Sequence, residues 1–215
     1  MNIFRILVVC VTLFGFWGSS FAISPKDIIK KVKEKYAGLT SLQAEFEQTF
    51  VWELAGESQT INGVIYLTQG NSYRVETDNQ AVITDGKTVW TYSKESSHVI
   101  IDLLNKADEN QLPKDLLFQY SEDYKPSIIS EKKVDGVKIY VLDLQPKDKD
   151  SFITSMKIWV DSKTWFTTKI EQIDINNNIN TYSVKNIRDD IELAEDLFKF
   201  EIPENTEIVD LRETK

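Results

Sequence analysis

Residues that carry most enzyme chemistry are scarce in this chain of 215 residues. It has one cysteine, Cys10, and one histidine, His98. Zinc sites take three or four protein ligands, usually histidine and cysteine, so a site of that kind is excluded. No G-x-S-x-G nucleophile elbow is present to give His98 a serine partner, and we interpret His98 as a surface or hydrogen-bonded residue. Glycosidase-like carboxylate pairs stay open, because any two of the 34 acidic residues could meet in the fold.

Glycine and positive charge are also in short supply. The 8 glycines are scattered and form no phosphate-cradling loop. With 25 basic and 34 acidic residues the net charge is −9, and no basic cluster stands out in the sequence. Such a chain repels phosphate backbones, so nucleic acid is excluded as a main partner. The acidic clusters at Asp148–Asp150 and Asp189-Asp190 lack calcium-loop spacing, and we interpret them as solvated turns.

The N-terminus holds the one long apolar run. Arg5 is followed by ILVVCVTLFGFW and then by Ser20 and Ala22 at small-x-small spacing. This pattern predicts a signal peptide over residues 1–22, cleaved after Ala22, and export of residues 23–215 as a single domain. A retained membrane anchor is the alternative, but the run is short for a bilayer span of roughly 20 residues. Because Cys10 lies inside this segment, the exported chain would contain no cysteine and no disulfide.

The first element after residue 22 is expected to be a helix. Ser24 reads as its N-cap, Pro25 as its first residue and Asp27 as the acidic partner in a capping box. Gly38 is a plausible stop. The apolar residues fall on one helical face: Ile28, Ile29, Val32 and Tyr36.

From Ser41 onward, alternation of apolar and polar residues dominates. In QAEFEQTFVWEL, Phe46 and Phe50 share one side of a strand, and similar short runs recur to the C-terminus with Gly, Asn and Asp between them. The pair Asp85-Gly86 between AVIT and TVWTY predicts a hairpin. Strands joined in this way indicate an antiparallel sheet, and a mainly β fold of the α+β kind, instead of alternating β and α units.

One segment interrupts the strands, Leu103–Tyr124. It is charged and helix-permissive, and Pro113 could open a turn of helix. We expect it to lie across one side or mouth of the sheet as a lid, with a small apolar face made of Leu112, Leu116 and Leu117.

Aromatic residues are plentiful at alternate strand positions, and this pattern has two explanations. They can form an ordinary packed core, or they can line an apolar cavity enclosed by a bent sheet beneath the lid. Both arrangements produce the same alternation, so the residues alone do not choose between them.

Five segments, taken together and in order, resemble a known family. They are SLQAEFEQTF, GVIYLTQGNSYRVET, ITDGKTVWTYS, LPKDLLF and LFKFEIPENTEIVD. In this order and spacing they resemble the periplasmic outer-membrane lipoprotein carrier family, LolA. The most specific pieces are the F-x-Q of Phe46 and Gln48 and the D-G-x-x-x-W-x-Y that starts at Asp85.

The resemblance implies a curved antiparallel sheet that forms an incomplete β-barrel covered by a few lid helices. It implies a monomeric periplasmic carrier with no cofactor and no enzymatic activity. Its partners would be acylated lipoproteins, an inner-membrane ABC-type release complex and an outer-membrane lipoprotein receptor. On this basis the candidate cavity residues are Phe46, Phe50, Tyr66, Tyr73, Trp90 and Tyr92.

The resemblance also bears on how the lid would be held. Family members often carry an arginine where this chain has Gln69, and a second arginine on the following strand, where this chain has Arg74. Arg74 is therefore a candidate lid latch, with an exposed strand arginine as the alternative. Two other functions stay open: a binder or sensor of other apolar ligands or of a partner protein, and a lipid-anchored outer-membrane receptor of the same superfamily.

Overall fold

A computed structural model describes residues 23–105 and 123–212. The expected N-terminal helix is present as α1, Pro25–Ala37. Ser24 caps it by accepting a hydrogen bond from the Asp27 N–H (3.1 Å), and the Ser24 hydroxyl donates to the Asp27 carboxylate (2.7 Å). Gly38 follows the last helical residue, and its N–H bonds back to the Glu34 carbonyl. No helix in the described ranges is long and apolar enough to cross a bilayer.

The strands of the described residues belong to one sheet, and their connections are mostly tight turns. Their bounds are β1 Ser41–Trp52, β2 Glu57–Thr68, β3 Tyr73–Thr77, β4 Gln80–Thr84, β5 Thr88–Ser93, β6 His98–Leu103, β7 Tyr124–Val134, β8 Val137–Pro146, β9 Ile153–Asp161, β10 Thr167–Asp174, β11 Ile179–Asp189 and β12 Glu207–Asp210, with a short 3-10 helix η2 at Glu195–Phe198.

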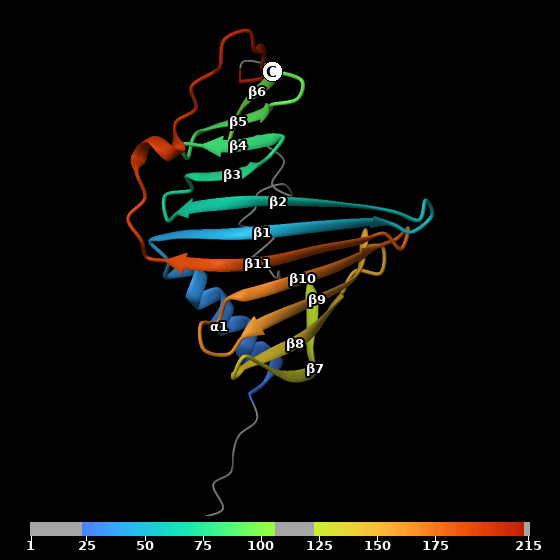
Figure 1. The fold of residues 1–215 in the computed structure, drawn as a ribbon. Helices are drawn as coiled ribbons and strands as arrows, with labels where there is room; N and C mark the ends of the chain where they lie inside the picture. The colour runs from blue at the N-terminus through green and yellow to red at the C-terminus, as the bar shows by residue number, and fades with distance from the viewer. Residues whose placement is uncertain (1–22, 106–122, 213–215) are drawn as a thin grey trace, which may run out of the picture.

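The sheet is open, as expected. Its order is β12-β6-β5-β4-β3-β2-β1-β11-β10-β9-β8-β7, with antiparallel neighbours apart from the parallel pair β12 and β6. The edge strands β12 and β7 lie at opposite ends of this order, and Figure 1 shows the curved ribbon between them. The fold class predicted from the sequence, a curved antiparallel sheet forming an incomplete barrel, is confirmed. Leu112, Leu116 and Leu117, the expected lid face, lie outside the described residues.

The Asp85-Gly86 hairpin is also confirmed. Gly86 has φ +92°, a backbone conformation that favours glycine. The Asp85 carboxylate accepts hydrogen bonds from the Lys87 N–H (2.9 Å) and the Thr88 N–H (2.8 Å). Asp85 and Lys87 are exposed, so the role of these residues is to form the turn.

We call the sheet face that carries α1 the inner face. Ile28 and Val32 of α1 are fully buried, and they belong to one core with sheet residues such as Leu142 and Ile158. Tyr36 packs edge-on against Phe166, with ring centroids 5.4 Å apart. The helix is therefore part of the main hydrophobic core.

The opposite, outer face has its own apolar layer over β3–β6. Ile83 and Val99 point to this side and are fully buried. The C-terminal segment of residues 190–206, which contains η2, runs back from β11 towards β12 beside these strands (Figure 1). The rings of Tyr92 and Phe200 lie 5.5 Å apart, and Phe198 is buried. The outer face of this half of the sheet is thus partly covered by the C-terminal segment.

Candidate ligand-binding face

The strand register divides the six candidate aromatics between the two faces. Residues directly opposite each other in a sheet point to the same side. Leu67 on the inner face pairs with Tyr73. On the other side Tyr66 pairs with Arg74, Arg74 pairs with Ile83, and Ile83 pairs with Trp90. The inner face therefore holds Phe46, Phe50 and Tyr73, and the outer face holds Tyr66, Trp90 and Tyr92. The six residues cannot line one cavity together.

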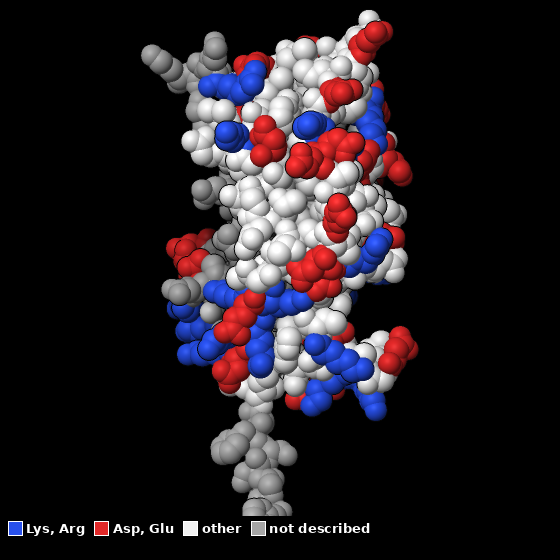
Figure 2. Space-filling model, turned by 90° about the vertical axis from the view of Figure 1, so that its left-hand side faces the viewer, with Lys and Arg blue, Asp and Glu red and all other residues white. Residues whose placement is uncertain are grey.

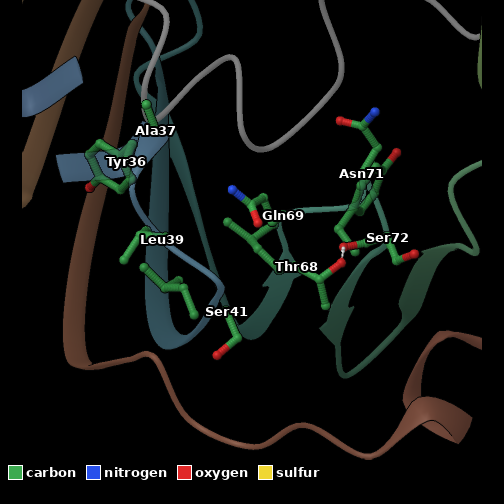
Figure 3. A pocket seen from close by; sticks show the side chains of 11 residues that line it. Tyr36, Ala37, Leu39, Ser41, Thr68, Gln69, Asn71 and Ser72 are labelled. Atoms are coloured by element: carbon green, nitrogen blue, oxygen red, sulfur yellow. Dashed lines mark hydrogen bonds between the residues drawn. The ribbon is translucent and has the colours of Figure 1, made fainter. Parts of the chain in front are cut away.

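A first cavity opens on the inner face where α1 ends. Its volume is about 220 Å³, and its lining combines apolar and polar side chains. Figure 3 shows Tyr36 and Leu39 on one side, with Thr68, Gln69 and Ser72 opposite. The full lining is Tyr36, Ala37, Leu39, Ser41, Leu42, Leu67, Thr68, Gln69, Asn71, Ser72 and Tyr73.

Short backbone contacts hold the polar side of this cavity. The Thr68 N–H donates to the Ser72 carbonyl (2.9 Å), and the Thr68 hydroxyl donates to the same oxygen (3.2 Å). The Gln69 N–H donates to the Thr40 carbonyl (3.0 Å), which joins the end of β2 to the start of β1. Gln69, at the position where the family resemblance would place an arginine, thus sits at the cavity rim.

A second cavity lies on the inner face near the far end of β1. It has a volume of about 230 Å³ and is lined by Gln48, Phe50, Trp52, Gln59 and Ile61. The rings of Phe50 and Trp52 are in contact, with centroids 4.6 Å apart. Only Phe50 among these was predicted as a cavity residue; Gln48, Trp52, Gln59 and Ile61 were not, although Gln48 belongs to the F-x-Q motif.

Phe46 stands between the two cavities along β1. A Cβ atom added to Gly63, its neighbour on β2, would lie 2.6 Å from the Phe46 ring, so this ring rests on the glycine. Ala44 and Ile65 beside it are almost completely buried. Along β1 the inner face is therefore packed at Phe46 and has a cavity on either side of it.

The aspartates that we expected to be solvated turn residues instead tie α1 and β1 to the end of β11. Asp189 forms an ion pair with Lys35 of α1. Asp190 accepts hydrogen bonds from the Thr40 N–H and hydroxyl, both at 2.9 Å. These bonds from Thr40 lower the pKa of the Asp190 carboxyl. The sequence gives no sign of these tethers because their partners are about 150 positions away.

Arg74 lies on the outer face and contacts the C-terminal segment. Its Nε donates to the Glu76 carboxylate (2.9 Å), and its Nη1 donates to the Leu197 carbonyl in η2 (3.3 Å). Burial raises the pKa of Glu76, but its bonds with Arg74 and Lys94 outweigh this and the net pKa is lowered. The lid segment that Arg74 was expected to latch lies outside the described residues.

Positive charge gathers at α1, whereas we expected no basic cluster in this chain. The helix carries Lys26, Lys30, Lys31, Lys33 and Lys35 against two acids. In Figure 2, basic side chains collect on the lower part of the face shown. The ammonium group of Lys31 lies 4.8 Å from the centre of the Trp165 ring, and that of Lys35 lies 4.9 Å from the centre of Phe166. Some of these lysines thus fasten the helix to aromatic residues between β9 and β10.

The described part of the chain shows no cluster that could bind a metal ion. Within residues 23–105 and 123–212, no three His, Cys, Asp or Glu side chains are grouped so as to hold a metal ion. His98 lies half-buried at the start of β6, on the inner face opposite Ser93.

Comparison of the sequence with known proteins identifies a family. The family profile described as "Outer membrane lipoprotein carrier protein LolA" matches residues 37–201. An outer-membrane lipoprotein carrier protein of Francisella philomiragia is 28% identical over 218 residues, covering 97% of this chain and 98% of that protein. Another of that name, from a Shewanella species (strain MR-7), is 28% identical and covers 86% and 88%.

Two further relatives have no assigned role in their names. The uncharacterized protein MJ0687 of Methanocaldococcus jannaschii is 27% identical over 201 residues; the match covers 90% of this chain but only 56% of that protein. The crystal structure of an uncharacterized conserved protein from Thermus thermophilus superposes with a TM-score of 0.59 at 13% identity, covering 86% and 98%, which shows a shared fold. Because the family profile spans most of the strands that build both faces, this chain belongs to the LolA family.

Proposed function

We propose that this protein is a periplasmic carrier that binds the acyl chains of lipoproteins on its inner face. It would receive them from an inner-membrane ABC-type release complex and pass them to an outer-membrane receptor, with no bond made or broken. The observation that carries this proposal is the inner face with its aromatic residues and a cavity towards each end of β1, in a chain of the LolA family. The two full-length relatives named as lipoprotein carriers support it.

Phe46, Phe50 and Tyr73 are the candidate aromatics placed to contact an acyl chain. Each cavity, at about 220 and 230 Å³, is smaller than the roughly 300–1,000 Å³ of a typical ligand site. A long chain therefore needs both cavities joined, and the Phe46 ring between them is the side chain that would have to turn aside.

The strength of binding has to be limited for a carrier to release its cargo. Burial of a methylene contributes about 0.8 kcal/mol, so full enclosure of one long chain contributes on the order of 10 kcal/mol. Complete enclosure of several chains would approach the ceiling of about 18–21 kcal/mol for non-covalent complexes. Two modest cavities fit partial enclosure, which keeps transfer to a receptor possible.

The carrier role requires export, and residues 1–22 would supply the signal. Mass spectrometry of the protein purified from the periplasm should find a free amino terminus at Ile23. An acylated cysteine at Cys10 would instead support the anchored receptor.

The direct test is complex formation. Purified protein lacking residues 1–22 is mixed with a triacylated lipoprotein in detergent, the detergent is removed, and the soluble fraction is analysed by size-exclusion chromatography with light scattering. We expect a soluble one-to-one complex, and none with the same lipoprotein lacking its acyl chains. Precipitation of the acylated lipoprotein beside a folded carrier would refute the proposal.

A further inference from the structure

A small polar cluster lies among aromatic residues on the inner face of β1 and β11. On β1 the inner face carries Phe46, Gln48 and Phe50 in alternation, and Gln48 pairs with Tyr182 of β11. The Gln48 Nε2 donates to the Asn180 Oδ1 (3.1 Å) and to the Tyr182 hydroxyl (3.0 Å). The Asn180 Nδ2 donates to the same hydroxyl (2.9 Å). Three polar side chains are therefore joined where the flanking inner positions of β1 are aromatic.

This cluster has hydrogen-bonding capacity left over. The Tyr182 oxygen already accepts two N–H bonds, so its own O–H points elsewhere as a donor. Gln48 uses its amide nitrogen twice, which leaves its Oε1 as an acceptor. Neither group has a partner among residues 23–105 and 123–212. Burial raises the pKa of Tyr182 by more than its bonds with Asn180 and Gln48 lower it, so the net pKa is raised. The hydroxyl therefore stays protonated at neutral pH.

Strand pairing alone does not explain the cluster. The backbone ladder between β1 and β11 runs from Leu42 to Val51 and sets the register without side-chain bonds. The Gln48 Oε1 and the Tyr182 O–H are half-buried without a partner among the described residues, which is costly, so an apolar residue at Gln48 would be the simpler structural solution. A donor and an acceptor kept available at this position indicate a polar ligand group.

The cluster also borders open space. Gln48 lines the second cavity beside Phe50 and Ile61. From Gln48 to Leu42, at the first cavity, six residues of β1 span about 20 Å at roughly 3.3 Å per residue. One leaflet of a bilayer core is about 15 Å thick, which is the reach of one acyl chain. A chain of this reach that begins at Gln48 would therefore lie along the inner face of β1 past Phe46 and end near Ala44, about 13 Å away and short of Leu42.

We infer that Gln48, Asn180 and Tyr182 bind the carbonyl-bearing linkage, ester or amide, through which a long acyl chain is attached to its carrier molecule. The Tyr182 O–H donates to the linkage carbonyl, and the Gln48 Oε1 accepts from an amide N–H where one is present. This inference rests on the proposed function and adds a polar feature that orients the acyl chain. The hydrogen bond to the linkage carbonyl would make the site selective for acyl groups over plain hydrocarbon.

The test compares an ester with an ether. A short-chain diacylglycerol and the dialkyl glycerol ether of equal chain length have the same apolar surface, but only the ester has carbonyls. Each ligand displaces a fluorescent fatty probe from the intact protein lacking residues 1–22. We expect the wild-type protein to bind the ester about 3- to 10-fold more tightly, the worth of one hydrogen bond. Tyr182→Phe should bind the ether as the wild type does and lose the preference for the ester.

Tyr66→Phe is the matched control, because it removes the same hydroxyl from the outer face and should keep the preference. Equal binding of ester and ether by the wild type, or a preference that persists in Tyr182→Phe, overturns the inference while leaving the carrier proposal standing. Failure of both ligands to bind the wild type overturns the carrier proposal and this inference with it. A thermal melt of Tyr182→Phe shows that the comparison is made on folded protein.

Discussion

At Gly63, β2 passes so close to its neighbours that a side chain has no room. An added Cβ would lie 2.5 Å from the Glu76 carbonyl oxygen and 2.6 Å from the Phe46 ring. The ring could turn, but the carbonyl belongs to the backbone of β3 and cannot. We predict that Gly63→Ala lowers the free energy of unfolding by about 1–3 kcal/mol, as overpacking does. Urea unfolding measures this value.

Gly70→Ala is the control for that substitution. The nearest atom to its added Cβ is 3.9 Å away, and its φ angle is not positive. We expect no loss of stability, and a gain of up to about 1 kcal/mol because alanine has fewer unfolded conformations. Equal destabilisation by the two substitutions would show that the close contact at Gly63 is not what matters.

Asp174 is a buried carboxylate at the turn between β10 and β11. Its Oδ1 accepts from the N–H groups of Asn176 (2.7 Å) and Asn178 (2.9 Å), and its Oδ2 accepts from the Asn178 side chain (2.9 Å). Burial raises its pKa, but these hydrogen bonds outweigh burial and the net pKa is lowered. The ionised carboxylate therefore stabilises the fold above the unfolded-state pKa of about 4, and this stabilisation disappears as the pH falls through the lower folded-state value.

We predict that Asp174→Asn lowers the melting temperature at pH 7, because the neutral amide accepts these bonds less strongly and loses the one from Asn178. As the pH falls through the lowered pKa of Asp174 the wild-type carboxyl becomes protonated too, so the melting temperatures should converge. Thermal melts across this range provide the measurement, with the exposed Asp78→Asn as control. A difference that stays constant with pH would mean that the ionised carboxylate is not the source.

Among the elements, the C-terminal segment of residues 190–206 is the one whose role the sequence did not reveal. It contacts the sheet through Phe200 against Tyr92 and through the Leu197 carbonyl, which Arg74 holds. Phe198 within it is 7% exposed. We predict that Phe198→Ala lowers the free energy of unfolding by about 3 kcal/mol, as loss of a buried phenylalanine does.

Phe152 gives the comparison for this prediction, because it lies just before β9 and is 59% exposed. Phe152→Ala should change the unfolding free energy by less than about 0.5 kcal/mol. Similar small effects from both substitutions would show that η2 is loosely attached and that β3–β6 are stable without it.

Elements defined by neighbouring residues could be predicted, and those defined by distant contacts could not. The helix α1 follows from Ser24, Pro25 and Gly38, and the β4–β5 hairpin from Asp85 and Gly86, all within a few positions. Alternation along β1 was also predicted correctly, since Phe46 and Phe50 both face inward, whereas Tyr66, which we expected to line the same cavity, faces outward. The tether between Asp190 and Thr40 joins residues 150 positions apart, and no local pattern encodes it.

At the scale of the whole molecule, the main difference between prediction and structure is which aromatic residues of different strands share a face of the sheet. The alternation shows that Trp90 and Tyr92 share a side of β5, but not whether this is the side of Phe46. That depends on the register of each intervening pair, and a shift of one residue inverts it. A cavity wall and the apolar layer under η2 are built from the same residue types. Aromatic content alone therefore could not show to which of the two an aromatic residue belongs.

The division into two faces makes ligand binding and stability separable. Phe50 lines the second cavity on the inner face, whereas Tyr92 packs against Phe200 on the outer face. We predict that Phe50→Ala weakens binding of a fluorescent fatty acid about tenfold or more, because the lost ring contributes roughly 1.5–3 kcal/mol of apolar contact. Tyr92→Ala should instead lower the urea midpoint and leave the affinity within about twofold, as expected for a distant site. Titrations without urea, at a temperature where both variants are folded, test the pair. If Tyr92→Ala lost as much affinity as Phe50→Ala, the acyl chain would have to reach the outer face, and the inner face could not be the sole binding surface.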